Sequence, residues 1–341
     1  MILVTGNSGY IGTVMTDFLQ KSSYKVVGLD CNYYKGCEFF SPNSMPFKQI
    51  LKDIRDINEQ DLEGISDIVH LAALSNDPLG EINPALTHEI NYFASLKLAK
   101  LAKKSGVNKF ILASSCSLYG IASDNKPIRE EGRLNPITAY AKSKVQAEQD
   151  ISKLADNNFH PVFMRNATVY GVSPNMRLDL VVNNLVAWAY LTGKVTIMSD
   201  GTPYRPVIHV EDFCRAFYAV LKAPVEKIHN QAFNVGIDKE NYQVKEIADQ
   251  VEKIVPDCQV EILNKTGPDE RTYRVEFSKI KKTLKFFQPN WDVKKGIKDL
   301  YVTYKNFNLN NRDFRSTKYF RIRWLDYLIQ NKKLNSDLRW I

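Results

Sequence analysis

The chain has 341 residues, of which 44% are hydrophobic and 25% are charged, so a collagen-like, low-complexity or largely disordered protein is excluded. Its 46 Lys and Arg residues exceed its 38 Asp and Glu residues, which gives a formal net charge of +8 at pH 7. This excess is compatible with an anionic partner or simply with a solvated basic surface.

The first 170 residues alternate short β-branched runs with segments of helical periodicity. Strands are predicted at Ile2–Thr5, Lys25–Asp30, Ser66–Ala73, Phe110–Ser114 and Pro161–Arg165. Helices are predicted from about Tyr10 and over Pro84–Ser105 and Pro136–Ala155. Repeated strand–helix units predict an α/β fold with a Rossmann-type doubly wound parallel sheet, which we assign to residues 1–170.

After Tyr170 this alternation loosens, and Pro and Gly residues interrupt the pattern. We expect residues 171–305 to form mainly a smaller, discontinuous C-terminal domain, with residues 204–236 returning to the first domain. Residues 306–341, called the tail below, are rich in Asn, Arg and aromatic residues.

The tail interleaves basic and aromatic residues, a composition that is compatible with nucleic-acid binding. Its basic cluster consists of Arg312, Arg315, Lys318, Arg321 and Arg323. Phe320, Trp324 and Leu328 are four residues apart, however, which favours an amphipathic helix that docks on the body or on a second subunit. We therefore expect no nucleic-acid partner.

A glycine-rich turn, Thr5–Gly12, joins the first predicted strand to the first helix. Gly6 permits the tight turn, Gly9 lets a pyrophosphate approach the backbone, and Gly12 lets the helix pack closely on the strand. Asp30 ends the second strand, where a carboxylate accepts hydrogen bonds from an adenosine ribose and repels a 2′-phosphate. The pattern predicts a dinucleotide site that prefers NAD to NADP, which makes residues 1–170 the expected NAD-binding domain.

Three further residues form a candidate catalytic set. Tyr140 and Lys144 are four residues apart, on one face of a predicted helix. The ordinary pKa of tyrosine is about 10, and a neighbouring ammonium and a positive nicotinamide ring both lower it. Ser115 follows a strand at the carboxyl edge of the sheet, where such sheets bind ligands. We expect Tyr140 to act as a base and Ser115 to hold a substrate hydroxyl against it.

Together these motifs resemble the extended short-chain dehydrogenase/reductases, the NAD-dependent nucleotide-sugar epimerase and dehydratase family. The resemblance covers about residues 1–305 and extends beyond the motifs already named. It includes Asp53–Asp56, His70–Ala73, Asn91, Ser114–Gly120, Tyr140–Lys144, Arg205 and His209–Asp212.

The resemblance implies roles for individual residues. The catalytic residues would be Ser115, Tyr140 and Lys144. NAD would be held by Gly6, Ser8, Gly9, Tyr10, Ile11, Gly12, Asp30, Asp53, Ile54, Leu71, Ala72, Ala73, Asn91, Tyr140 and Lys144. The substrate would be a nucleotide-diphosphate sugar, and residues 171–305 would be mainly the substrate domain. The diphosphate of this substrate would bind Arg205, and the protein would be a homodimer.

The chemistry implied by the family begins when the Tyr140 phenolate removes a proton from a sugar hydroxyl, usually at C4, while hydride passes to the nicotinamide. An epimerase returns the hydride to the other face of the 4-keto sugar. We therefore expect a nucleotide-sugar epimerase, with a 4-dehydrogenase or 4-ketoreductase as the alternative. A catalytically silent NAD-binding regulatory protein is the non-enzyme alternative, which the intact Ser115, Tyr140 and Lys144 argue against.

The sequence also departs from the family. Cys116 and Ser117 stand where the 4,6-dehydratases carry an Asp-Glu pair, so dehydration loses its acid and base. Cys116, one of the candidate substrate-binding residues, is either an acid–base group itself or, as we favour, a small filler beside the nicotinamide. Thr266 stands where many members carry an arginine, and Arg271 is the candidate to take over that diphosphate contact.

Residues 167–185 and Pro268–Tyr273 resemble a narrower group of oxidoreductases that act on nucleotide-linked sugars, including GDP-heptoses, for bacterial surface polysaccharides. This likeness makes Arg177, Asn183 and Asn184 candidate substrate-loop residues. A capped surface helix explains the same three residues equally well.

Membrane spans, disulfides and metal sites are not expected. No apolar run approaches the ~18 residues that a membrane-spanning helix needs, and the N-terminus shows no signal-peptide pattern. The five cysteines contain no C-x-x-C pair, and the five histidines show no ligand spacing. We expect a soluble, cytoplasmic, metal-free protein.

Overall fold

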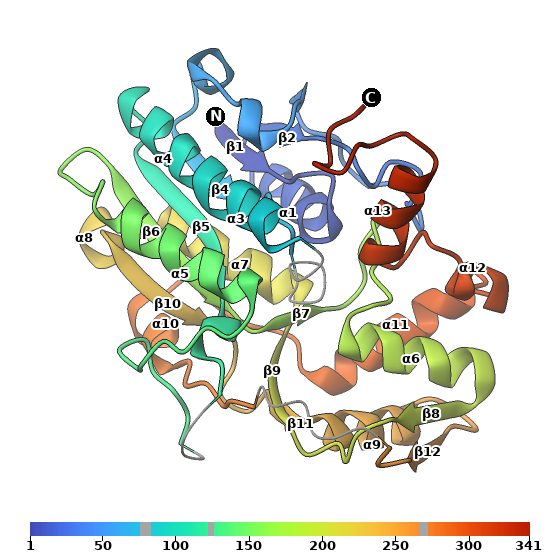
Figure 1. Cartoon of the computed structure of the whole chain (residues 1–341). Coiled ribbons are helices and arrows are strands. Elements are labelled where there is room, and N and C mark those ends of the chain that lie inside the picture. The colour runs from blue at the N-terminus through green and yellow to red at the C-terminus, as the bar shows by residue number, and fades with distance from the viewer. Residues whose placement is uncertain (76–82, 122–125, 266–271) are drawn as a thin grey trace.

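The computed structural model describes residues 1–75, 83–121, 126–265 and 272–341, and it confirms the predicted α/β fold (Figure 1). Within these residues a parallel seven-stranded sheet has the order β10-β6-β5-β4-β1-β2-β3. The strands are β1 Ile2–Thr5, β2 Val26–Asp30, β3 Lys48–Leu51, β4 Asp67–His70, β5 Lys109–Ser115, β6 His160–Asn166 and β10 Gln231–Val235.

Helices cover both faces of this sheet and bury one apolar cluster on each side (Figure 1). On one face α1 (Tyr10–Lys21) packs against α7 (Val210–Lys222). On the other face lie α3 (Pro84–His88), α4 (Ala94–Lys104) and α5 (Ala139–Ser152). A π-helical turn, η3, joins α3 to α4, so the helix expected over 84–105 is continuous but irregular.

The smaller lobe has its own apolar cluster, formed where three helices pack together. These helices are α6 Val181–Thr192, α9 Val244–Ile254 and α11 Val293–Asn306. The lobe also contains two small sheets. One pairs β8 (Lys194–Ile197) with β12 (Gln259–Ile262), and the other consists of β7 (Thr168–Tyr170), β9 (Tyr204–His209) and β11 (Asn241–Gln243). The short helices α8 (Val225–Ile228) and α10 (Ser278–Thr283) lie near β6 and β10. Residues 204–236 contribute β9 to the lobe. They then return to the seven-stranded sheet, where α7 packs on one face and β10 forms an edge strand.

Two predicted boundaries differ from the structure for local reasons. The strand expected over 66–73 ends at His70, because the amides of Leu71 and Ala72 turn to donate to Thr5 Oγ1 at 3.2 Å. The helix expected from Pro136 begins at Ala139, because Thr138 Oγ1 caps it by accepting from the Ala141 amide at 3.2 Å.

The tail docks on the body of its own chain. Its helices are α12 (Asn311–Arg315) and α13 (Arg321–Gln330), and α13 buries Leu325 and Leu328. The Trp324 indole donates to the Tyr33 carbonyl at 2.6 Å, so α13 lies against the loop that follows β2, as Figure 1 shows in red beside blue.

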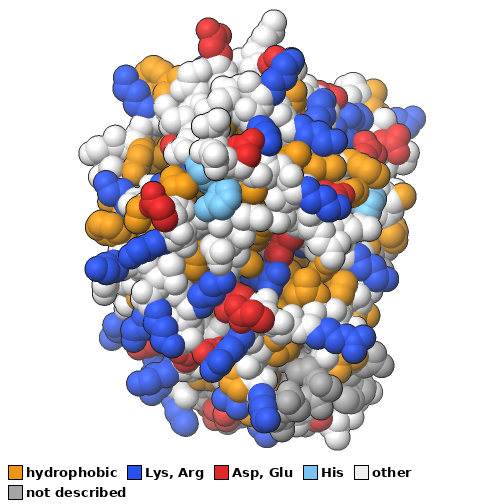
Figure 2. Space-filling view, turned by 90° about the vertical axis from the view of Figure 1, so that its left-hand side faces the viewer, with side chains coloured by type: hydrophobic (Ala, Val, Ile, Leu, Met, Phe, Trp, Pro, Cys, Tyr) orange, Lys and Arg blue, Asp and Glu red, His pale blue; other side chains and the backbone are white. Residues whose placement is uncertain are grey.

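The exposed charges are mixed on the face drawn in Figure 2, where Lys and Arg side chains are interspersed with Asp and Glu. In the described part of the chain, no helix is both long and apolar enough to span a membrane.

Candidate active site

A cavity of about 560 Å³ lies where the carboxyl ends of the central strands meet the smaller lobe. Its volume is in the range of small-molecule sites, and doubly wound sheets bind ligands at this edge. The lining includes the glycine turn, the ends of β2, β5 and β6, the segment after β4, and lobe residues from 177–181 and 199–205.

The glycine turn has the geometry of a phosphate cradle. Gly6 has a φ of +71°, and a Cβ there would lie 2.9 Å from the Ala72 nitrogen. Gly9 is the N-cap of α1, and because it has no side chain the first amides of the helix stay open to an anion. Gly12 packs against the turn so closely that a Cβ would lie 2.6 Å from the Asn7 Cα.

The far end of the cavity suits an adenosine. Asp30 accepts hydrogen bonds from the amides of Ser8 (3.0 Å) and Asn32 (2.7 Å), and burial raises the pKa of its carboxyl. Asp53 and Ile54 also line the cavity, although the Asp53 carboxylate already forms an ion pair with Arg55 at 2.7 Å. An open helix terminus and a carboxylate that line one cavity fit a dinucleotide such as NAD.

One wall of this cavity is formed by Leu71, Ala72 and Ala73, as expected. Asn91 lies behind that wall: its Oδ1 accepts from the Leu74 amide at 2.8 Å and its Nδ2 donates to the Leu74 carbonyl at 3.1 Å. Asn91 therefore fixes the backbone that lines the cavity. Tyr10 and Ile11 line it directly.

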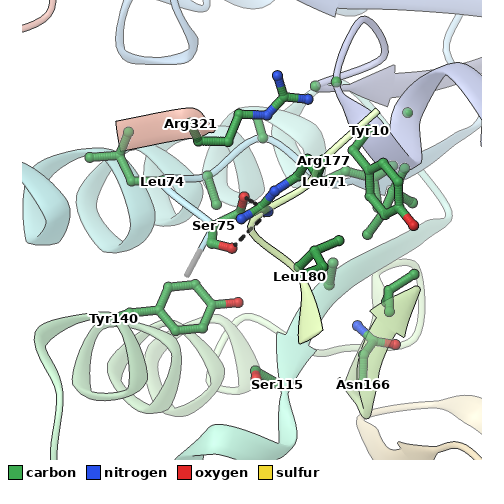
Figure 3. Close-up of a pocket in the computed structure, with 18 of the residues that line it drawn as sticks. Tyr10, Leu71, Leu74, Ser75, Ser115, Tyr140, Asn166, Arg177, Leu180 and Arg321 are labelled. Carbon is green, nitrogen blue, oxygen red and sulfur yellow. Dashed lines mark hydrogen bonds between the residues drawn. The ribbon is translucent and has the colours of Figure 1, made fainter. Parts of the chain in front are cut away.

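The three candidate catalytic residues face the same cavity, and Figure 3 shows Tyr140 and Ser115 on the same side of it. Lys144 is buried, and its Nζ donates to the Ala113 carbonyl at 2.8 Å and lies 5.8 Å from the centroid of the Tyr140 ring. Burial lowers the pKa of Lys144 to about 8. The Ser115 hydroxyl accepts from the Ser117 amide at 3.1 Å and keeps its own proton to donate.

Two candidate arginines also reach the cavity. Arg177 is buried, forms a bidentate ion pair with Asp179 at 2.8 and 2.9 Å, and donates to Ser75 Oγ at 3.2 Å (Figure 3). Burial lowers its pKa, but Asp179 outweighs this effect, so that the pKa is raised. Arg205, from β9, lines the cavity on the lobe side.

Other predicted substrate residues are not brought to the cavity wall. The Cys116 thiol donates to the Arg165 carbonyl at 3.1 Å within the apolar core, and burial raises its pKa. Asn184 donates to the Leu178 carbonyl at 2.7 Å, and Asn183 donates to the Arg177 carbonyl at 3.0 Å, so both brace the segment around Arg177. Arg271 lies outside the described residues.

The cavity also contains residues that sequence reasoning missed, among them Ser75, Asn166 and Arg321. Asn166 ends β6 directly beside Ser115 in the sheet register, and its Oδ1 is buried without a hydrogen-bond partner in the described part of the chain. Its position at a strand's carboxyl end was an available signal. Arg321 comes from the tail, and nothing local in the sequence connects it with this site.

Side chains that could hold a metal ion are not clustered in the part of the chain that the structure describes. Within residues 1–75, 83–121, 126–265 and 272–341, no group of three or more His, Cys, Asp or Glu side chains is arranged to hold one.

Comparison with known proteins connects this geometry to characterised chemistry. The chain is 28% identical to the UDP-glucuronate 4-epimerase of Thermodesulfobacterium geofontis, over 87% of this chain and 93% of that protein. It is 27% identical to UDP-glucuronic acid decarboxylase 1 of Arabidopsis thaliana, over 91% of this chain and 71% of that protein.

A solved structure is similar throughout its length. The UDP-glucuronic acid 4-epimerase of Bacillus cereus, in complex with UDP-glucuronic acid and NAD, superposes with a TM-score of 0.74 at 26% identity. The similarity covers 89% of this chain and 99% of that one.

The model of the family described as "NAD dependent epimerase/dehydratase family" matches residues 2–236, which is more than half of the chain. The protein therefore belongs to the NAD-dependent epimerase/dehydratase family of enzymes, with NAD as its cofactor.

Proposed function

We propose that this enzyme is a nucleotide-sugar 4-epimerase. The observation that carries the proposal is that Ser115, Tyr140 and Lys144 line the same cavity as the glycine turn. A sugar in this cavity would lie between a base and the cofactor, and two of the compared proteins are 4-epimerases of a UDP-sugar.

NAD held at the glycine turn would supply the group that takes up and gives back a hydride. Tyr140 removes the proton from the C4 hydroxyl, because the nearby Lys144 ammonium favours the phenolate. Ser115 donates a hydrogen bond to the same sugar oxygen and keeps it beside Tyr140. Arg205 provides a cation on the lobe side for the diphosphate of the substrate.

The residues after Ser115 favour return of the hydride over elimination of water. Elimination needs an acid and a base beside the sugar. Cys116 faces the Arg165 carbonyl with a raised thiol pKa, so it stays protonated and is directed away from the substrate. Ser117 lines the cavity but has no ionisable group in the ordinary pH range.

A panel of nucleotide sugars tests this function. Purified protein is incubated with UDP- and GDP-linked hexoses and hexuronic acids, with and without added NAD, and the products are identified by NMR while reduced nicotinamide is followed by absorbance. Inversion at C4 with no net reduced nicotinamide is the expected result. Net formation of reduced nicotinamide would indicate a 4-dehydrogenase, and loss of carboxylate from a hexuronic acid would indicate a decarboxylase.

Replacing the base separates catalysis from binding. Tyr140→Phe keeps the ring but removes the hydroxyl, so kcat is expected to fall by about 10²- to 10⁴-fold while NAD still binds. Tyr24→Phe, at a partly buried tyrosine that packs edge-on against Tyr218, is the matched control and keeps wild-type kcat. Full activity in Tyr140→Phe would rule out this catalytic assignment.

A further inference from the structure

The tail places a buried cation in the wall of the cofactor cavity. Arg321 is the first residue of α13, its side chain is 2% exposed, and it is among the residues that line the cavity. Its guanidinium stacks over the Tyr34 ring, 3.9 Å from the centroid. Figure 3 shows the side chain on the side of the cavity opposite Tyr140 and Ser115.

The described residues satisfy only part of the hydrogen-bonding capacity of this guanidinium. Nη2 donates to the carbonyl and to Oδ1 of Asn175, at 3.0 and 2.8 Å. Nη1 is buried and has no hydrogen-bond partner in the part of the chain that the structure describes. A buried donor left in this state costs about 1–3 kcal/mol. The site therefore favours a ligand that brings an acceptor.

The same contacts connect Arg321 to the glycine turn. Asn175, which accepts from Arg321, donates through Nδ2 to the Ser8 carbonyl at 2.9 Å. Asp30, which holds the Ser8 amide, is close enough to Arg321 for the guanidinium to oppose the rise in its pKa. The Arg321 guanidinium thus lies beside the glycine turn, whose amides are open to an anion.

The charges around Arg321 leave room for an anionic ligand. The other buried arginine in this wall, Arg177, is already paired with Asp179. Asp30 is engaged by two backbone amides. Burial lowers the pKa of Arg321, but a guanidinium stays protonated in proteins, so the charge persists.

We infer that Arg321 binds the pyrophosphate of NAD through Nη1, so that the tail completes the cofactor site from outside the seven-stranded sheet and its helices. A diphosphate carries negative charge, which attracts the guanidinium, and its oxygens can accept a hydrogen bond from the buried Nη1–H. The substrate's diphosphate is the other source of this chemistry, but Arg205 stands on the lobe side, whereas Arg321 stands beside Ser8 and Asp30. The inference does not depend on which sugar reaction the enzyme catalyses.

Calorimetry with the full-length, cofactor-stripped protein tests the contact directly. The probes are ADP, which has the diphosphate, adenosine, which lacks it, and UDP, which represents the substrate. Arg321→Gln is expected to weaken ADP binding by about 10- to 100-fold, because a charge-assisted hydrogen bond is lost. Adenosine and UDP affinities are expected to stay within about twofold of wild type.

The control is Arg323→Gln, two residues further along the same helix, where the guanidinium is exposed over Phe320. It is expected to bind all three probes like wild type. Arg321→Lys keeps the charge and is expected to lose less ADP affinity than Arg321→Gln, which gives a second measurement if the glutamine variant fails to fold.

Three outcomes would overturn the inference. Unchanged ADP affinity in Arg321→Gln would show that no phosphate contact exists, and unchanged ADP affinity in Arg321→Lys, where that is the variant that folds, would contradict a contact through Nη1. An equal loss of adenosine and ADP affinity would show that Arg321 acts by packing alone. A loss confined to UDP would assign the guanidinium to the substrate.

Discussion

Lys144 shows how burial and chemistry are coupled at a single residue. Its ammonium is enclosed beneath the Tyr140 ring and makes its hydrogen bond to the Ala113 carbonyl of β5. Burial of the charge is the main cause of its lowered pKa of about 8, and Glu148 opposes that shift. The spacing of four residues predicts that Tyr140 and Lys144 share a helix face. It does not predict the lowered pKa, which depends on how α5 packs on β5.

This pKa leads to a prediction about stability and pH. The ordinary lysine pKa is 10.5, so between about 8 and 10.5 the unfolded chain binds the proton and the folded chain does not. The free energy of unfolding of the cofactor-free protein therefore rises with pH across that window, and Lys144 contributes about 3 kcal/mol to the rise. Lys144→Met is expected to remove that part of the rise.

Urea unfolding of the wild type and the variant, at about pH 7 and about pH 10, measures the difference. Lys142→Met is the control, because Lys142 is exposed on the same helix. If the free energy of unfolding of Lys144→Met rose with pH as steeply as that of the wild type, the rise could not be assigned to the lowered pKa of Lys144.

Residues of the site differ in how far the sequence could predict them. Gly6, Asp30 and Ser115 stand at the ends of strands, so the periodicity that predicts the strands also places them at one edge of the sheet. Cys116 is adjacent to Ser115, yet the 3₁₀ turn over Cys116–Tyr119 directs its thiol to Arg165. Such side-chain directions depend on tertiary packing, which sequence spacing does not contain.

At the scale of elements, helix α1 packs closely on the glycine turn. Gly12 of α1 lies against the backbone of Gly6 and Asn7, where a side chain has no room. Gly12→Ala is therefore expected to lower the free energy of unfolding by about 3 kcal/mol, because the overlap is with backbone and cannot be relieved by a rotamer change.

Gly106→Ala is the matched control for that substitution. Gly106 lies between α4 and β5, where open space surrounds the position of its Cβ, and its φ of +75° adds a strain of only about 1 kcal/mol. Chemical denaturation of both variants gives the comparison. An equal loss in the two would show that the close approach of α1 to the turn contributes nothing.

Elements of the first 170 residues were largely predictable because buried parallel strands are continuous apolar runs. β3 was missed, since it is an edge strand whose Lys48, Gln49 and Leu51 are exposed and carry no such signal. In the lobe, β7 and β9 pair across more than thirty residues of intervening chain, and local periodicity does not specify a pairing of this kind.

At the scale of the whole molecule, the tail accounts for most of the net charge. Residues 306–341 contain eight Lys and Arg residues and three Asp residues, against a formal charge of +8 for the chain. Some of these cations are used within the protein: Arg321 is buried, and Arg339 forms ion pairs with Asp53 and Asp56. The sequence suggested an amphipathic helix here, but not the surface on which it docks.

Apolar burial, more than charge, is expected to hold the tail in place. Leu325, Leu328, Leu334 and Leu338 are between 1% and 6% exposed and belong to the apolar cluster beneath α4. Leu328→Ala is therefore expected to cost about 2–5 kcal/mol of unfolding free energy. Arg339→Gln is expected to cost less than about 1 kcal/mol, because its guanidinium is one-third exposed and solvent screens its ion pairs.

The stabilities of these two variants are compared by denaturant unfolding, and hydrogen exchange shows which residues open first. A single transition for Leu328→Ala, shifted as a whole, would show that the tail unfolds together with the seven-stranded sheet. Early exchange confined to residues 321–340 would show a tail that detaches separately, and would then carry Arg321 away from the cofactor cavity. A larger loss in Arg339→Gln than in Leu328→Ala would contradict the apolar account, and would make the basic character of the tail its main means of attachment.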